Sequence, residues 1–409
     1  MENKGLSRTP RLVLGVLTLL FAGIIYAWSI LKSPLGDAFG WTPADLAFNY
    51  TLTICFFCLG GLISGIMAKK TSPRFRLILA AVMVFIGFFV TSRLSGASII
   101  PLYLAYGVVS GLGIGLVYNT VIATTSAWYP DKKGMCSGWL FMGFGFSTLI
   151  LGNIAGKMIE MPSIGWRTTF VVLGIAIAAA LIICSFLIKA PGPDFKPPVS
   201  EKAQASKAVA ETDPSIKTDF TAQEMVRRPS FWMLFVFFIL FAAVGSTAIS
   251  FAKDFCVSLG AAGSFAVTMV GILSVFNGLG RLFSGWFFDK QGLRKTQYIT
   301  SAVAIAATLV SLISVMTGSL ALGIIGISLC GFSYGFSPTV SAAIVAAFYG
   351  TKHYALNLGV INLILIPAAF TATLAGSFVT KTGSYVSTFV MLLAFSVVGL
   401  IINLFIKKA

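Results

Sequence analysis

The sequence predicts an all-α integral membrane protein with twelve transmembrane helices in two pseudo-symmetric six-helix bundles. Three observations predict it: the composition, a succession of long apolar runs, and a repeat between the two halves. With 57% hydrophobic and 10% charged residues, the chain of 409 residues is far more apolar than a soluble protein, in which about 25% of residues are charged. The lipid bilayer is therefore the expected solvent.

Apolar runs of about 20 residues, long enough to cross a bilayer, define the predicted helices. Those of the first half lie near 12–31, 46–68, 76–94, 99–127, 135–158 and 166–189, and those of the second half near 231–252, 262–288, 297–317, 319–348, 355–380 and 385–406. A polar stretch rich in Pro, Lys, Ala and acidic residues separates the two sets. The predicted organisation is an N-terminal bundle (1–189), a cytoplasmic linker (190–230) and a C-terminal bundle (231–409).

The basic residues predict the orientation in the membrane. If both termini are cytoplasmic, 22 of the 29 Lys and Arg residues lie in inner segments and six in outer ones, as positive charge favours the cytoplasmic side. Because the basic residues occupy short gaps between apolar runs, the net charge of +16 indicates membrane orientation and no nucleic-acid partner.

The two halves repeat at a constant offset of 220 residues, which indicates a duplicated six-helix unit. The matching pairs fall in several different segments. They are Gly65 and Gly285, Lys70 and Lys290, Gly111 and Gly331, Gly115 and Gly335, Tyr129 and Tyr349, and Lys132 and Lys352.

The residues that carry most enzyme chemistry are scarce. The six cysteines are scattered, Cys55 and Cys58 lack a second pair, and the one histidine, His353, is predicted in a loop. The sequence also has no glycine-rich phosphate loop ending in Gly-Lys-Ser/Thr. We therefore expect no cofactor, no metal site and no enzymatic activity.

One charge, Arg281, is predicted deep inside a span. It precedes Asp289 by eight residues, which places it about 12 Å from that end of its helix at ~1.5 Å per residue. A cation at this depth normally faces a bundle interior and has a partner, yet all thirteen acidic residues are predicted in loops or near span ends. The carboxylate of a transported anion is the expected counter-charge. Asn277, one turn earlier, is expected either to bind substrate or to make a helix contact.

Two groups of residues carry a family resemblance. The loop at 285–295, with Gly285, Asp289, Lys290 and Gly292, resembles the cytoplasmic loop signature of the major facilitator superfamily; its first-half copy has Lys69 in place of the acid. Further segments resemble the oxalate/formate antiporter and monocarboxylate transporter branch of that superfamily. They are 111–115, Tyr118, 128–134, 137–138, 143–145, 165–167, 231–232 and 277–281.

This resemblance implies the major facilitator fold and a transporter of the bacterial inner membrane with a substrate-binding Arg281. It implies that Tyr118 and Tyr334 line a cavity, and Phe144 replaces a family tyrosine. Leu365 occupies the place of a lysine in the oxalate antiporter, so a dicarboxylate would keep one charge unpaired. The expected substrate is therefore a monocarboxylate such as lactate, pyruvate, acetate or propionate.

Four further residues each have two possible roles or a weaker link to the site. Tyr26 and Trp28 on the first helix are expected either in the cavity wall or in packing, and Asn362 is a further candidate for substrate binding. Asp254 is a candidate proton carrier or a boundary residue near the outer end of the seventh helix. Asn277 takes the place of an aspartate of the animal monocarboxylate transporters, which counts against their proton relay here.

The leading functional hypothesis is proton-coupled symport of a monocarboxylate by a monomeric protein through alternating access. Exchange of organic anions is the second hypothesis within the transporter class. An anion channel or a nontransporting membrane receptor is the hypothesis from another class.

Overall fold

The computed structural model describes residues 8–96, 98–192, 195 and 219–406, and every regular element in these ranges is helical. Most of the predicted linker, residues 196–218, lies outside the described residues. The first-half helices are α1 (Thr9–Ala22) with η1 (Gly23–Ala27) and α2 (Trp28–Leu31), α3 (Ser33–Phe39), α4 (Pro43–Met67), α5 (Pro73–Ser92), α6 (Ile100–Leu102) with η2 (Tyr103–Ser110) and α7 (Gly111–Ser126), α8 (Lys133–Ser147) with η3 (Thr148–Gly152) and α9 (Asn153–Glu160), and α10 (Gly165–Leu187).

The second half begins with the short helix α12 (Ala222–Val226) and continues with six long helical segments. These are α13 (Pro229–Ser258), α14 (Gly263–Gln291), α15 (Leu293–Thr317), α16 (Leu320–Phe348), α17 (Tyr354–Ile361) with η4 (Asn362–Ile364) and α18 (Leu365–Thr382), and α19 (Val386–Phe405). Counted with their 3-10 and π segments, the described residues form twelve long helical rods, as the apolar runs predicted.

Eleven of the twelve rods are long and apolar enough to cross a membrane. Helix α14 has 29 residues, and its sequence carries Arg281, Asp289 and Lys290. Large apolar side chains such as Met316 and Ile183 are exposed on the outside of the molecule, as expected where lipid replaces water.

Local sequence signals place the helix ends. Thr42 begins α4: its hydroxyl accepts a hydrogen bond from the Asp45 N–H at 3.2 Å, and the Asp45 carboxylate accepts one from the Thr42 N–H at 3.1 Å. Pro43 follows at the first helical position, where its missing N–H has no cost. Gly318 ends α15 with φ of 67°, a left-handed conformation that glycine adopts freely.

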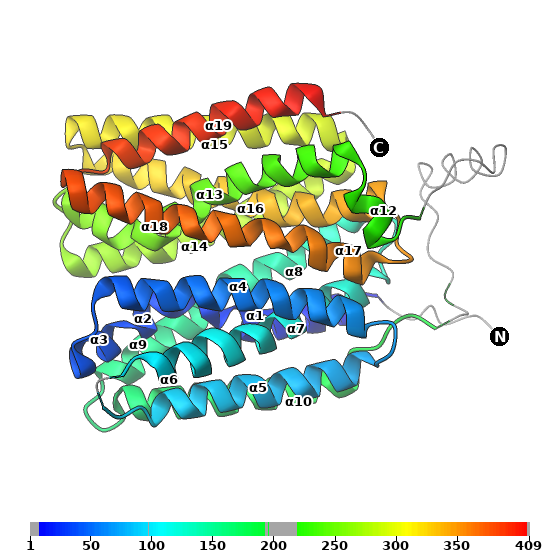
Figure 1. The fold of residues 1–409 in the computed structure, drawn as a ribbon, viewed down its shortest axis with the longest axis horizontal. Coiled ribbons are helices and arrows are strands. Elements are labelled where there is room, and N and C mark those ends of the chain that lie inside the picture. Colours follow the sequence, from blue (N-terminus) through cyan, green and yellow to red (C-terminus); the bar gives the residue numbers. More distant parts are fainter. Residues whose placement is uncertain (1–7, 97, 193–194, 196–218, 407–409) are drawn as a thin grey trace.

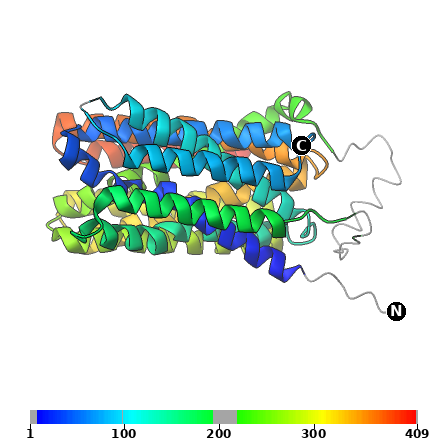
Figure 2. The same ribbon diagram turned by 90° about the horizontal axis from the view of Figure 1, so that it is seen from below.

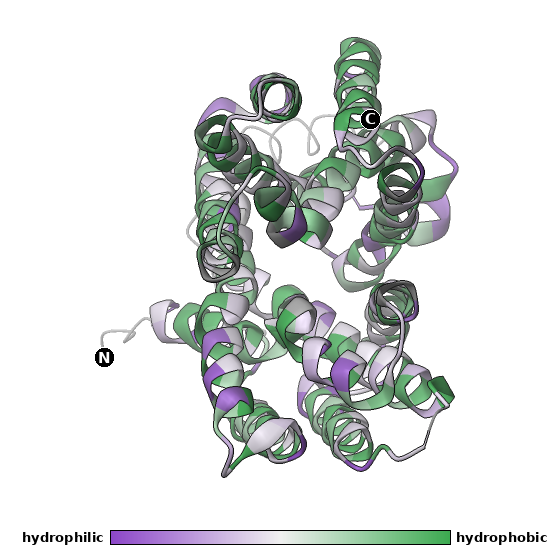
Figure 3. Ribbon diagram, turned by 90° about the vertical axis from the view of Figure 1, so that its left-hand side faces the viewer, coloured by the Kyte–Doolittle hydropathy of each residue, from purple (hydrophilic) through white to green (hydrophobic). Residues whose placement is uncertain are grey.

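The helices form two bundles that lie side by side with their axes roughly parallel (Figure 1). One contains α1–α10 and the other α13–α19, and Figure 3 shows the two groups end-on. Helix α1 begins and α19 ends at the same end of the molecule (Figure 2). We call this the basic end, because the loops after α4, α7 and α16 that lie there carry Lys69, Lys132 and Lys352, and the last turn of α14 carries Lys290.

The two halves touch at the basic end through equivalent glycines. A Cβ at Gly285 of α14 would lie 2.1 Å from the Gly134 carbonyl oxygen, and a Cβ at Gly65 of α4 would lie 2.6 Å from the Ala355 carbonyl oxygen. Since Gly65 and Gly285 are a repeat pair, the 220-residue offset has a direct structural counterpart. Only glycine permits such close helix approach.

The polar contacts at these two crossings differ. On one side the Asp289 carboxylate accepts hydrogen bonds from the Gly134 and Met135 N–H groups at the start of α8, at 3.0 and 2.7 Å. On the other side the position equivalent to Asp289 is Lys69, and Asn119 Nδ2 instead donates to the Ala355 carbonyl at 2.9 Å. The first-half crossing therefore has a neutral hydrogen bond where the second has a charged one.

Helix α13 ends six residues later than the predicted 252. Asp254 accordingly lies within the last turns of an unbroken helix, where it is exposed. The end of the predicted linker is also ordered: the Phe220 N–H donates to the Tyr349 carbonyl at 3.0 Å, and Asn357 Nδ2 donates to the Phe220 carbonyl at 2.9 Å.

Candidate substrate-binding site

Arg281 is buried between the two bundles, with 1% of its surface exposed. It lies on α14, and its Nε donates to Asn277 Oδ1 at 3.0 Å one turn away. One terminal nitrogen, Nη1, donates to the main-chain carbonyl of Phe141 on α8, in the other half. The guanidinium therefore bridges the two halves.

Both acceptors of Arg281 are neutral oxygens. Among the described residues, the ion pair found is that of Arg8 with Asp131, far from Arg281 along the chain and within the first half. No carboxylate of the described residues lies within ion-pair distance of Arg281. Because a buried charge is costly unless paired, this arrangement favours an anion brought from outside.

The polar stripe of α14 faces the protein interior. Ser274, Asn277, Arg281 and Ser284 are buried, whereas Leu279 is 45% exposed. At Gly138 of α8 a Cβ would lie 2.7 Å from the Arg281 carbonyl oxygen. The small residues of α8 thus bring this helix against α14 at the depth of the arginine.

An aromatic cluster lies on the first-half side of Arg281 and includes Phe141, whose main-chain carbonyl accepts from the guanidinium. Tyr118 of α7 stacks on Phe141 with 5.4 Å between ring centroids and packs edge-on against Phe144 at 5.2 Å. Phe57 of α4 completes the cluster, 4.9 Å from Tyr118 and 5.9 Å from Phe144. This wall is apolar apart from the Tyr118 hydroxyl, and it lowers the dielectric around the cation.

Tyr26 and Tyr334 close the site from opposite halves. Their hydroxyl oxygens lie 3.3 Å apart, within hydrogen-bond distance. The ring of Tyr26, on η1, also packs edge-on against Phe144 with centroids 5.2 Å apart. The structure therefore places Tyr26, Tyr118, Phe144, Tyr334, Asn277 and Arg281 in one connected group.

Three further candidates lie in other surroundings. Trp28 packs against Tyr106, and its indole N–H donates to the Leu46 carbonyl at 2.8 Å, within the first half. Asn362 is buried in η4, where its side-chain Nδ2 has no partner. Its main-chain carbonyl accepts a hydrogen bond from the Cys58 thiol at 3.3 Å. Asp254 is exposed near the end of α13 opposite the basic end.

The sequence did not single out Phe57 or Phe141. Phe57 lies between the two cysteines considered above, and its only sequence signal is its aromatic side chain. Phe141 contributes a main-chain oxygen, which no side-chain pattern reveals. In the described part of the chain, no group of three or more His, Cys, Asp or Glu residues is arranged to hold a metal ion.

Two bundles of membrane-crossing helices that share a buried cation define a membrane transporter of the two-halves type. Residues 13–366 match the model of the Major Facilitator Superfamily, and the chain belongs to this superfamily. It resembles the oxalate/formate antiporter and monocarboxylate transporter branch.

Relatives from three organisms illustrate this branch. The oxalate:formate antiporter of Oxalobacter formigenes is 27% identical over 84% of this chain and 79% of its own. An uncharacterized transporter of the superfamily from Escherichia coli, YhjX, is 28% identical over 88% of this chain and 86% of its own. Monocarboxylate transporter 12 of Xenopus laevis is 23% identical over 95% of this chain and 88% of its own.

Solved structures share the fold at low identity. The fucose:proton symporter of E. coli superposes with a TM-score of 0.68 and 15% identity, over 98% of this chain and 99% of that one. A proton:xylose symporter superposes with a TM-score of 0.70 and 16% identity, over 98% of this chain and 97% of that one. These similarities establish the major facilitator arrangement of helices.

Proposed function

We propose that the protein is a secondary active transporter of a small monocarboxylate, of the size of lactate, pyruvate or acetate. The observation that carries the proposal is the buried guanidinium of Arg281, which meets only neutral oxygens among the described residues. A planar guanidinium matches a carboxylate with two parallel hydrogen bonds, and the match strengthens away from water.

The position of Arg281 also supports alternating access. It contacts α8 in one half while belonging to α14 in the other, so a carboxylate bound there interacts with both bundles. Rocking of the halves around this group would expose it to each side in turn. We assign the basic end to the cytoplasm, with both termini inside and the protein acting as a monomer in the inner membrane.

The family resemblance at Leu365 supports one carboxylate per substrate. Leu365, at the start of α18, is 6% exposed and apolar. A second carboxylate would find no lysine there, unlike in the oxalate antiporter that this region resembles. Proton symport is the proposed coupling, with Asp254 as the candidate carrier within α13.

Exchange of two anions is the second candidate, and one observation favours it. When no anion is bound, Arg281 has no carboxylate partner among the described residues. Reorienting this empty site exposes or moves an unpaired buried charge, which is costly. A transporter with this site therefore reorients to the opposite side more readily when a second anion is bound to Arg281.

Proteoliposomes distinguish the two modes. Symport predicts lactate uptake into empty vesicles that accelerates with an inward proton gradient. Exchange predicts uptake only after the vesicles have been loaded with an anion, and strict dependence on loading would contradict symport.

The site itself is tested by substituting Arg281. Arg281→Ala should abolish lactate uptake into proteoliposomes, and Arg281→Lys should weaken lactate binding at this site about tenfold or more because the two-pronged contact is lost, a change of ~1.4 kcal/mol. Arg93→Lys, at an exposed arginine near the end of α5, is the matched control. Lactate uptake by Arg281→Ala at the rate of the parent protein would defeat the proposal.

Misfolding is separated from loss of the site by the ligand-free melting temperature. Removing an unpaired buried charge should leave that temperature unchanged or raise it. A variant that melts normally and no longer takes up lactate has lost the site and kept the fold.

A further inference from the structure

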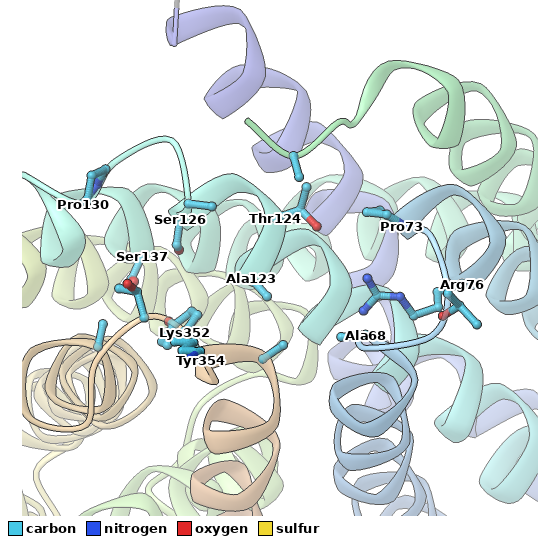
Figure 4. A pocket seen from close by; sticks show the side chains of 16 residues that line it. Ala68, Pro73, Arg76, Ala123, Thr124, Ser126, Pro130, Ser137, Lys352 and Tyr354 are labelled. Atoms are coloured by element: carbon cyan, nitrogen blue, oxygen red, sulfur yellow. The ribbon is translucent and has the colours of Figure 1, made fainter. Parts of the chain in front are cut away.

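A cavity lies between the two halves at the basic end, and Arg281 is not among its lining residues. Its volume is about 460 Å³, and its walls come from the α4–α5 turn, α7 and α8 of the first half and from α16 and α17 of the second. Figure 4 shows Arg76 on one side of this cavity and Lys352 and Tyr354 on the other. We call it the basic-end cavity.

Arg76 is the main polar group of the cavity. It lies in the first turn of α5, only 4% of its surface is exposed, and its guanidinium extends toward the other lining side chains (Figure 4). Nη1 donates to the carbonyl and hydroxyl oxygens of Ser64 at 3.2 and 3.3 Å, whereas the buried Nε has no partner. Among the described residues no carboxylate lies within ion-pair distance of Arg76.

The rest of the lining is suited to an anion. It contains no Asp or Glu, and it adds Lys352 and the hydroxyl-bearing Thr71, Thr124, Ser126 and Ser137. Lys352 is exposed, and its main-chain N–H donates to the Asp219 carboxylate at 3.0 Å. Arg76 therefore supplies the desolvated charge, and Lys352 supplies a second, more hydrated one.

We propose that the basic-end cavity is a second anion site that binds a small carboxylate, with Arg76 as its anchor. An isolated buried guanidinium with an unused N–H is completed by a carboxylate oxygen, and hydroxyls on the opposite wall can donate to the remaining oxygens. The proposed site does not include Arg281. The proposal therefore holds whether or not the anion that binds Arg281 is the transported substrate.

The position of the cavity between the halves gives the site a consequence for transport. An anion bound to Arg76 of the first half and near Lys352 of the second stabilises the arrangement in which the basic end is closed. The anion therefore binds the closed state more tightly than the open state, and its binding shifts the equilibrium toward the closed state. High anion concentration at the basic end should slow turnover.

The test uses the full-length protein in detergent without phosphate and measures equilibrium binding of radiolabelled lactate and radiolabelled oxalate. In the Arg281→Ala background one saturable site should remain for at least one of the two probes. Adding Arg76→Gln should weaken it about tenfold or more, and adding Lys352→Gln should weaken it less. Arg74→Gln is the matched control, since exposed Arg74 lies two residues away over the Phe186 ring.

Two outcomes overturn the inference. One is the absence of saturable binding of either probe by Arg281→Ala, and the other is equal binding by Arg281→Ala with and without Arg76→Gln. Arg76→Gln alone, with Arg281 intact, should keep binding at the central site, which shows that this variant folds. If Arg281→Ala loses binding at the central site but keeps binding at the cavity, the two sites are independent. Failure of the proposed function can then be told apart from failure of the cavity site.

Discussion

At the scale of single residues, the molecule is organised around cations that lack carboxylate partners in the described part of the chain. Arg281 is held by Asn277 and by a main-chain oxygen of Phe141, and Arg76 by Ser64. Hydrogen bonds from neutral groups orient a guanidinium without neutralising it. Each cation is therefore positioned for an anion that the chain does not supply.

Leu365 gives a residue-scale prediction on substrate choice. Leu365→Lys adds a second cation at the start of α18, so oxalate should bind about tenfold more tightly, as expected for one added charge-assisted contact of ~1.4 kcal/mol. The ligand-free variant should melt at a lower temperature, because Leu365 is buried. Isothermal titration with oxalate and lactate measures both affinities.

Leu365→Met is the control for this variant, since it keeps an apolar side chain of similar volume. It should change neither affinity. Unchanged oxalate affinity in Leu365→Lys, with the fold intact, would show that Leu365 does not face the bound anion.

At the scale of elements, α14 combines three tasks in one helix. Its polar stripe carries Arg281, its outer face carries exposed Leu279 and Trp286, and Asp289 near its end caps the start of α8. One helix therefore links the candidate site to the contact with α8 at the basic end.

Asp289 yields the prediction at this scale. A carboxylate that accepts from two N–H groups at a helix start stabilises the contact by about 1 kcal/mol through the helix dipole. Asp289→Asn should therefore shift the conformational equilibrium roughly fivefold toward an open basic end. A cysteine introduced at Ser137 in the cavity, in a background without other cysteines, should react faster with a maleimide.

Asp131→Asn is the matched control, because Asp131 pairs with Arg8 inside the first half and does not join the halves. It should leave the labelling rate unchanged. Equal rates in Asp289→Asn and the parent protein would show that the capping contact does not hold the basic end closed.

At the scale of the whole molecule, the two halves meet through glycines at the basic end. Gly65 approaches Ala355 and Leu356 so closely that a Cβ would lie 2.6 and 2.7 Å from their main-chain atoms, too near for any other residue. A Cβ at Gly61, one turn away on the same helix, would lie 3.8 Å from its nearest neighbour, the Gly115 carbonyl oxygen. The closing of the halves therefore depends on Gly65 in particular.

Gly65→Val should wedge the basic end open and lower anion transport about tenfold or more, because overpacking at a closed contact favours the state that lacks it. Pulsed electron paramagnetic resonance between spin labels at positions 74 and 352 should show a longer distance. Gly61→Ala should transport normally, and a normal distance in Gly65→Val would contradict the prediction.

The helices were predictable because the bilayer forces each segment to satisfy its own main-chain hydrogen bonds. Long apolar runs therefore became helices near the predicted bounds, and the late end of α13 is the largest difference. Arg281 was predictable as a site candidate for the same reason, since a lone charge in an apolar run is costly. Arg76 was not: it stands at the predicted start of the third helix, where a basic residue is ordinary, whereas the structure buries its side chain.

The sequence by itself determined the number, bounds and repeat of the helices and the presence of a cation in one of them, because these follow from local apolarity and charge. Only the tertiary structure decided the partners: the Phe141 carbonyl 140 residues from Arg281, Tyr26 against Tyr334, and Arg76 beside a cavity shared by both halves. These contacts depend on how two bundles pack across a shared surface. Packing of that kind is set by shape and close approach, which one-dimensional patterns do not contain.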